Sequence, residues 1–214
     1  MNEQGYEVVS STPVFSGRVI SLRTDDVRMS DGSVSRREVV SHPGAVAIVA
    51  LDDADRVVLV NQYRHPIGGR LDELPAGLLD VVGESALEGA KRELFEEAAL
   101  RAEHWEVLVD LYPSPGMSGE SIRIFLARGL SEVGADDRFS PEHEELTMTV
   151  RQVPLAEAAG CALSGELTNG AAVAGVLAAL VLRSGGLGST PARPVSAPWP
   201  ARPDRVEPAA DPVA

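Results

Sequence analysis

The chain has 214 residues, of which 44% are hydrophobic, enough to form the core of one domain or of two small ones. Its 32 acidic and 19 basic residues give a formal net charge of −13, which argues against a surface for nucleic acid or anionic membrane, because such surfaces need clustered Lys and Arg. The single cysteine, Cys161, excludes a disulfide within the chain and indicates a reducing cytoplasm.

Residues 1–43 predict a β-rich N-terminal region. The N-terminal sequence MNEQGYEVVS has neither a basic start nor an apolar run, so we expect no signal peptide. Two extended segments, RVISLRTDDVRM (18–29) and SVSRREVV (33–40), flank the sequence Ser-Asp-Gly. Extended segments on both sides of such a turn are typical of an antiparallel hairpin.

Residues 44–185 predict the main domain. GAVAIVALDD (44–53) is a continuous apolar run typical of a central strand, and RVVLVNQYR (56–64) is expected to be its antiparallel partner. Residues 65–77 contain Pro and Gly and predict a loop with a short strand. The hydrophobic period becomes helical over 85–98, where Ser85 and Glu88 form a capping-box pattern at the helix start.

The rest of the main domain predicts further strands and helices. We expect strands within 105–116 and 121–130, an acidic loop at 131–145, a strand at 146–155, and helices at 155–163 and 169–184. The apolar stretch 170–182 is too short to span a bilayer and predicts a buried helix. Residues 186–214 are rich in Pro, Ala and Gly and predict a disordered tail. Mixed strands flanked by helices predict an α/β sandwich with a mixed sheet.

The helix at 85–98 brings three carboxylates together, although like charges repel at this spacing. At about 100° per residue, Glu93 and Glu97 share one shoulder of the apolar stripe, whereas Glu96 faces away. Glu88, Arg92 and Glu96 follow one another at intervals of four residues and predict an ordinary surface ladder of ion pairs. Glu93 and Glu97 have no cation one turn away within the helix. Such a pair suits a hard cation such as Mg²⁺ or Mn²⁺, and a solvated acidic face is the alternative.

The stretch 77–100 resembles the Nudix box of the Nudix hydrolases. In that box a glycine precedes a glutamate, which is followed after seven residues by Arg-Glu-aliphatic-any-Glu-Glu. Glu84 and the sequence RELFEE (92–97) match this spacing. Two positions differ, because six residues rather than five follow Gly77, and Ala99 replaces the glycine that usually caps the helix in a left-handed conformation.

Three further segments are similar to ADP-ribose pyrophosphatases: QYR (62–64), ELPAG (73–77) and SPG (114–116). The segment 165–180 resembles actinobacterial members of that group, and the whole resemblance covers about residues 5–185. It implies a Nudix-type α/β/α sandwich with a mixed β-sheet, preceded by antiparallel N-terminal strands. It also implies hydrolysis of ADP-ribose to AMP and ribose 5-phosphate, and a homodimer in which the N-terminal strands of one subunit help to build the site of the other.

The resemblance also implies which residues hold the metal and act in catalysis. The metal ligands are expected to be Glu93, Glu97, the backbone carbonyl of Ala76 and, through water, Glu96. Arg92 and Glu97 are the catalytic residues expected within the box. The base that activates water is expected in the acidic loop, which offers Glu142, Glu144 and Glu145, and Glu145 fits best by its distance to the following strand.

Four residues are candidates for substrate binding. Arg37 and Arg64 suit phosphate or ribose, because the planar guanidinium group can donate two hydrogen bonds to one ligand group. Glu73 is expected to accept a hydrogen bond from a ribose hydroxyl or the adenine amine. Glu120 resembles a family position near the terminal ribose.

Two alternative functions stay open. The first is a Nudix enzyme that hydrolyses another nucleotide sugar or a dinucleotide with the same metal site. The second is a non-catalytic nucleotide-binding module. Such modules usually lose glutamates of the box, and here all of them are present.

Overall fold

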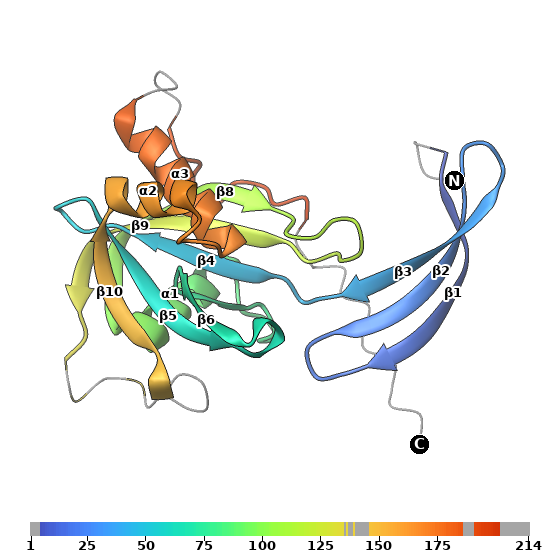
Figure 1. The fold of residues 1–214 in the computed structure, drawn as a ribbon, viewed down its shortest axis with the longest axis horizontal. Helices are drawn as coiled ribbons and strands as arrows, with labels where there is room; N and C mark the ends of the chain where they lie inside the picture. The colour runs from blue at the N-terminus through green and yellow to red at the C-terminus, as the bar shows by residue number, and fades with distance from the viewer. Residues whose placement is uncertain (1–4, 135, 137–138, 140–145, 186–190, 202–214) are drawn as a thin grey trace. The chain divides into compact units, whose positions relative to one another are not determined.

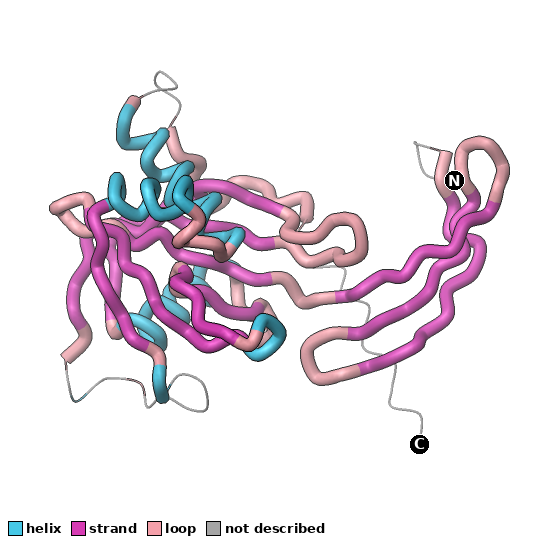
Figure 2. Tube along the Cα trace, viewed as in Figure 1, coloured by secondary structure: helices cyan, strands magenta, loops and turns pink. Residues whose placement is uncertain are grey.

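The computed structural model describes residues 5–134, 136, 139, 146–185 and 191–201, which form two compact units (Figures 1 and 2). The N-terminal unit contains residues up to 44 together with the loop 112–121 and Ala201. The main unit contains residues 45–111 and 122–200.

The N-terminal unit is a three-stranded antiparallel sheet in the order β1-β2-β3, with strands Glu7–Ser16, Ser21–Arg28 and Val34–Ser41. The predicted hairpin is therefore confirmed, and one further strand precedes it. The sheet carries exposed apolar side chains, including Val14 at 58% and Phe15 at 56% exposure. Within the described part of this unit the sheet has no apolar core of its own.

The main unit contains two sheets. The first has the order β7-β4-β9-β8 and is mixed, because β4 runs parallel to β9 while its other pairs are antiparallel. Its strands are Ala76–Leu78, Ala45–Ala50, Ile122–Glu132 and Leu100–Leu111. The second sheet, β10-β5-β6, is antiparallel, with strands Thr149–Pro154, Arg56–Arg64 and Gly69–Glu73. The short 3-10 helix η1 (His65–Ile67) joins β5 to β6.

Helices cover both faces of the mixed sheet. Helix α1 (Ala86–Ala98) packs Ala90 and Leu94 against Val46 and Phe125 on one face. Helices α2 (Leu155–Ser164) and α3 (Gly170–Ser184) lie over the other face. Strand β4 is buried along its whole length, which explains its continuous apolar sequence. The α/β/α sandwich predicted from the sequence is confirmed.

The expected pairing of β4 with β5 is wrong. The two strands meet only at one bridge, Leu51 to Val57, and then separate into different sheets. Each strand has two better partners in the fold, since β4 lies between β7 and β9, and β5 lies between β10 and β6. Local sequence does not contain these distant pairings. Strand β8 also begins earlier than predicted, at Leu100, directly after α1.

The predicted disordered tail is wrong for residues 191–201, the part of it that the structure describes. Arg193 and Val107 exchange two backbone hydrogen bonds of 2.7 and 3.0 Å at the free edge of β8. Trp199 is buried. In Figure 1 this segment is the red stretch beside β8. No helix among the described residues is both long and apolar enough to cross a membrane.

Candidate active site

Helix α1 has well-defined ends that set the position of its carboxylates. At the start, the Ser85 hydroxyl accepts a hydrogen bond of 3.2 Å from the Glu88 backbone N–H, as the capping pattern predicts. At the end, Ala99 has φ 52° and ψ 40°, and its N–H donates to the carbonyls of Leu94 and Phe95. The replacement of the usual glycine therefore left the left-handed cap in place.

Glu93 and Glu97 lie inward, where they are 8% and 9% exposed. The Glu97 Oε2 atom accepts a hydrogen bond of 2.9 Å from the backbone N–H of Ala76 on β7. Gly77, the next residue, faces the carboxylate of Glu93 so closely that a Cβ atom there would collide with it. The glycine that opens the box is thus needed because α1 and β7 approach each other at the carboxylate.

Arg92 links the acidic groups of the box. It forms a bidentate pair with Glu84, with N–O distances of 3.0 and 3.1 Å. Its Nη1 atom also donates to Glu93 at 2.5 Å and to Glu96 at 3.1 Å. The predicted pair with Glu96 is confirmed, whereas Glu88 pairs with Lys91 at 2.9 Å rather than with Arg92. Glu93 has no cation one turn away within the helix, as expected, and is paired instead by its direct neighbour Arg92. Adjacent helical residues do not normally face each other, and the long guanidinium side chain overcomes that geometry.

The ionisation of this cluster follows from its contacts. The hydrogen bonds that Arg92 donates to Glu84, together with its interactions with Glu93 and Glu96, outweigh burial and raise the pKa of Arg92, so that it stays charged. Burial raises the pKa of Glu93, although the charge and hydrogen bond of Arg92 oppose this effect. A buried carboxylate with a raised pKa is stabilised in its charged form by any further cation that approaches it.

The donor chemistry of this cluster fits a hard divalent cation. Glu93, Glu96 and Glu97 offer carboxylate oxygens, and Ala76 offers a backbone carbonyl beside the N–H that Glu97 already binds. Mg²⁺ and Mn²⁺ prefer such oxygens and complete their coordination with water and phosphate. In the described part of the chain, no three acidic, histidine or cysteine side chains are already gathered around a common point. Arg92 pairs with Glu93 and Glu96 and holds their carboxylates toward itself, which is one reason why these carboxylates do not surround a common point.

Two predicted substrate residues of the main unit pair with each other. Arg64, at the end of β5, forms a bidentate pair with Glu73, at the end of β6, with N–O distances of 2.9 and 2.7 Å. Glu73 is only 3% exposed, whereas Arg64 is half-exposed. The sequence suggested two independent ligand contacts. The structure instead has Glu73 neutralised by Arg64 and holding its guanidinium group in place.

The other predicted residues lie elsewhere. Arg37 is an exposed residue of β3 in the N-terminal unit, where its Nη1 atom donates to the Arg36 carbonyl at 3.0 Å. Glu120 belongs to the loop 112–121 of the same unit, with its Oε1 atom 3.9 Å from His42 Nδ1. The three candidate bases, Glu142, Glu144 and Glu145, fall outside the described residues.

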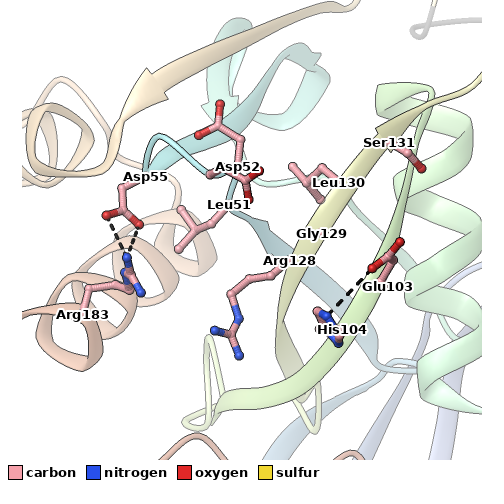
Figure 3. A pocket seen from close by; sticks show the side chains of 11 residues that line it. Leu51, Asp52, Asp55, Glu103, His104, Arg128, Gly129, Leu130, Ser131 and Arg183 are labelled. Atoms are coloured by element: carbon pink, nitrogen blue, oxygen red, sulfur yellow. Dashed lines mark hydrogen bonds and ion pairs between the residues drawn. The ribbon is translucent and has the colours of Figure 1, made fainter.

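A pocket of about 590 Å³ lies in the main unit, away from every predicted site residue (Figure 3). Its lining includes Asp52, Asp55, His104, Arg128 and Arg183. Its charges are largely matched within the protein, since Arg183 pairs with Asp55 at 2.8 Å and Arg128 pairs with a glutamate of β8 at 2.6 Å. This pocket therefore offers little unmatched charge to a ligand.

The sequence reasoning missed Arg123, a buried arginine of β9. Arg123 is 4% exposed and forms a bidentate pair with Asp110 on β8, with N–O distances of 2.8 and 3.0 Å. The segment IRIFLAR, in which Arg123 interrupts an apolar strand, was the available signal, because a charge within a buried strand needs a partner.

Comparisons with known proteins agree with this geometry. The NUDIX domain family matches residues 41–168, and the nucleoside diphosphate sugar hydrolase N-terminal domain matches residues 6–40. An ADP-ribose pyrophosphatase of Mycobacterium tuberculosis is 49% identical over 203 residues, which cover 95% of each chain. An ADP-ribose pyrophosphatase of Bacillus subtilis is 39% identical over 58% of this chain and 67% of its own.

A solved structure shares the fold. The crystal structure of an ADP compounds hydrolase superposes with a TM-score of 0.73 at 22% sequence identity, covering 87% of this chain and 98% of the other. The family match spans most of the chain, and its box carboxylates converge on β7 from α1. The chain therefore belongs to the Nudix hydrolase family.

Proposed function

We propose that this protein is an ADP-ribose pyrophosphatase, which hydrolyses the diphosphate of ADP-ribose to AMP and ribose 5-phosphate. One observation carries the proposal: the 49% identity to an ADP-ribose pyrophosphatase extends over nearly the full length of both chains. It includes the box, whose glutamates are all present. The non-catalytic alternative has no comparable support.

Different residues of the main unit have different roles in the hydrolysis of the diphosphate, which carries two negative charges. Glu93, Glu97 and the Ala76 carbonyl, with Glu96 through water, would hold Mg²⁺ or Mn²⁺. When bound, the cation neutralises the diphosphate oxygens and lowers the pKa of attached water. Arg92 keeps Glu84, Glu93 and Glu96 in fixed positions. Arg64, oriented by Glu73, presents its guanidinium group to a phosphate or ribose oxygen.

Proton removal from the attacking water is assigned to the acidic loop. Glu145 is the proposed base, with Glu142 and Glu144 as the alternatives within the same loop. Arg37 and Glu120, in the N-terminal unit, are the proposed contacts to phosphate and terminal ribose. Single Glu→Gln variants of the three loop glutamates would identify the base, because only one of them should remove most of the activity while leaving substrate binding intact.

The experiment that tests the proposal is AMP release from ADP-ribose with Mg²⁺ or Mn²⁺, for wild type and Glu97→Gln. We expect wild-type turnover and a loss of several orders of magnitude in the variant, since a ligand to the cation is removed. Mn²⁺ binding, measured by electron paramagnetic resonance, should weaken in parallel without substrate. Absence of AMP release at any metal concentration would reject the proposal.

A second substrate class deserves the same assay. The N-terminal match is to a nucleoside diphosphate sugar hydrolase domain, and a GDP-mannose pyrophosphatase of Cronobacter sakazakii is 32% identical over 63% of this chain and 73% of its own. A panel of ADP-ribose, other nucleotide sugars and dinucleotides distinguishes the two possibilities by kcat/KM. Preference for a nucleotide sugar over ADP-ribose by tenfold or more would favour the alternative.

We further propose a homodimer that exchanges its N-terminal strands. The β1-β2-β3 sheet exposes Val8, Val14, Phe15 and Val34 and has no apolar core among the described residues of its unit. A sheet of this kind gains stability when a second chain covers its apolar side chains.

The proposed place of action is a reducing cytoplasm, which the single free cysteine, Cys161, supports.

A further inference from the structure

The C-terminal segment 193–199, called the strap here, is held by the buried Arg123 and its half-buried partner Asp110. Arg123 donates from Nη1 to the Ala197 carbonyl at 2.9 Å and from Nη2 to the Pro198 carbonyl at 3.0 Å. Its guanidinium carbon lies 4.8 Å from the ring centroid of Trp199, a cation–π contact. The strap therefore ends on Arg123 with both backbone and side-chain contacts.

Asp110 anchors the other end of the strap. Its carboxylate accepts from Arg123 at 2.8 and 3.0 Å and from Arg193 at 2.9 Å. Burial raises the pKa of Asp110, but the hydrogen bonds from the two arginines outweigh it and keep the pKa below its usual range. The strap thus starts at the edge of β8, beside Val107, and crosses to β9.

The register of the sheet places this anchor on the same row as Gly77, which faces the carboxylate of Glu93. Gly77 pairs with Val46, Val46 pairs with Arg123, and Arg123 pairs with Asp110, across β7, β4, β9 and β8. Directly paired residues point to the same face of a sheet. Gly77 faces Glu93 of α1, so all four residues lie on the α1 face. Arg123 is two strands from Gly77, which corresponds to about 10 Å.

We propose that the strap is a positioning element of the active site. Trp199 and Arg123 hold β9 and β8 in place beside the carboxylates of Glu93 and Glu97, and the diphosphate substrate binds tightly as a result. This inference rests on the proposed function. Arg123 and Trp199 are positioning residues in this scheme, because they act through the sheet. An ordered strap that only protected the β8 edge would stabilise the fold without affecting substrate affinity.

The seating of the strap can be measured without substrate. The chain has two tryptophans, so Trp105→Phe leaves Trp199 as the only indole. We expect a blue-shifted emission and low acrylamide quenching from Trp199 in this variant. A solvent-exposed spectrum would overturn the proposal, whatever the enzyme hydrolyses. Adding Arg123→Lys should increase the quenching, because Lys lacks the planar group that contacts both carbonyls and the ring.

The functional test compares two truncations of the full chain. One ends at Ala201 and keeps the strap, and the other ends at residue 190 and removes it. We expect wild-type kinetics from the first, and from the second a KM increase of roughly tenfold, about 1.4 kcal/mol of binding. A loss of folded protein alone would lower the maximal rate and leave KM unchanged. Equal KM values for the two truncations would overturn the proposal.

Point variants of Trp199 separate ring packing from other effects. Trp199→Ala should raise KM in the same direction as the truncation, whereas Trp199→Phe should restore it, since a phenyl ring still packs on Arg123. Phe lacks the indole N–H, which has no acceptor among the described residues, so little is lost with it. The comparison uses ADP-ribose or whichever substrate the panel selects. An inactive wild type therefore rejects the proposed function, and unchanged KM in an active enzyme rejects the strap.

Discussion

At the scale of single residues, the site depends on close approach rather than on charge alone. Gly77 has no side chain to keep β7 away from Glu93, and the neighbouring backbone N–H of Ala76 binds Glu97 at 2.9 Å. Arg92 then offsets part of the negative charge around it by forming ion pairs with Glu84, Glu93 and Glu96. The carboxylates are held in place before any cation arrives, which reduces the entropy lost on binding.

The Gly77→Ala variant tests this steric role. Its Cβ atom would occupy the space of the Glu93 carboxylate, so the carboxylate must move or β7 must shift. We expect Mn²⁺ affinity to fall by about tenfold or more, in the range found for residues that support metal ligands. Gly160→Ala in α2 is the matched control, because a Cβ there meets nothing within 4 Å. Unchanged Mn²⁺ binding in Gly77→Ala would show that the close approach has no role in the site.

At the scale of elements, helix α1 has a well-capped N-terminus and a strained C-terminus. Ser85 caps the first turn, whereas Ala99 adopts φ 52° at the C-cap, a conformation that costs an L-residue with a Cβ atom about 1 kcal/mol. The helix keeps this conformation because the chain must turn directly into β8, which begins at Leu100. Ala99 differs from the glycine of the family pattern, whereas the left-handed backbone conformation at this position is the one that the glycine usually adopts.

Ala99→Gly is therefore expected to stabilise the protein. Relief of the left-handed strain should raise the free energy of unfolding by about 1 kcal/mol, measured by urea denaturation. Ala98→Gly, one residue earlier and within the helix, is the control and should lower it by about 0.5–1 kcal/mol. A loss of stability in Ala99→Gly equal to that of the control would contradict the strain argument.

At the scale of the whole molecule, the two units differ in how far they bury their apolar side chains. The main unit buries apolar clusters on both faces of its mixed sheet. The N-terminal sheet leaves its valines and Phe15 exposed, and its two arginine–aspartate pairs at Arg23 and Arg36 are partly exposed. Exposed ion pairs contribute little to stability, so apolar cover from the second chain of the proposed dimer would be the stronger source.

Strand exchange between subunits predicts complementation of inactive variants. Arg37→Ala lies in the N-terminal unit and Glu97→Gln in the main unit. If each active site combines units of two chains, a co-expressed heterodimer has one intact site, and the mixture should regain about one quarter of wild-type activity by the statistics of a two-fold dimer. If each site uses one chain only, no activity returns. Light scattering on the same samples would establish the dimer independently.

The sequence by itself determined the family and much of the chemistry. The spacing of Glu84 to the RELFEE segment identified the box, and the helical period put Glu93 and Glu97 on one shoulder. These inferences succeeded because helix geometry is local, so the relative direction of residues four apart follows from the period alone. The Ser85 cap followed for the same reason, whereas the sequence did not decide whether Ala99 would keep the left-handed conformation.

Only the tertiary structure decided the contacts between segments distant in the chain. Local pattern did not reveal that β4 leaves β5 for β9, that Arg64 neutralises Glu73, or that the Pro-rich end packs on Arg123. Each depends on which partner is available after the chain has folded back, and a buried charge or a free sheet edge takes the partner that satisfies it. Periodicity describes one element at a time, whereas these partners come from several.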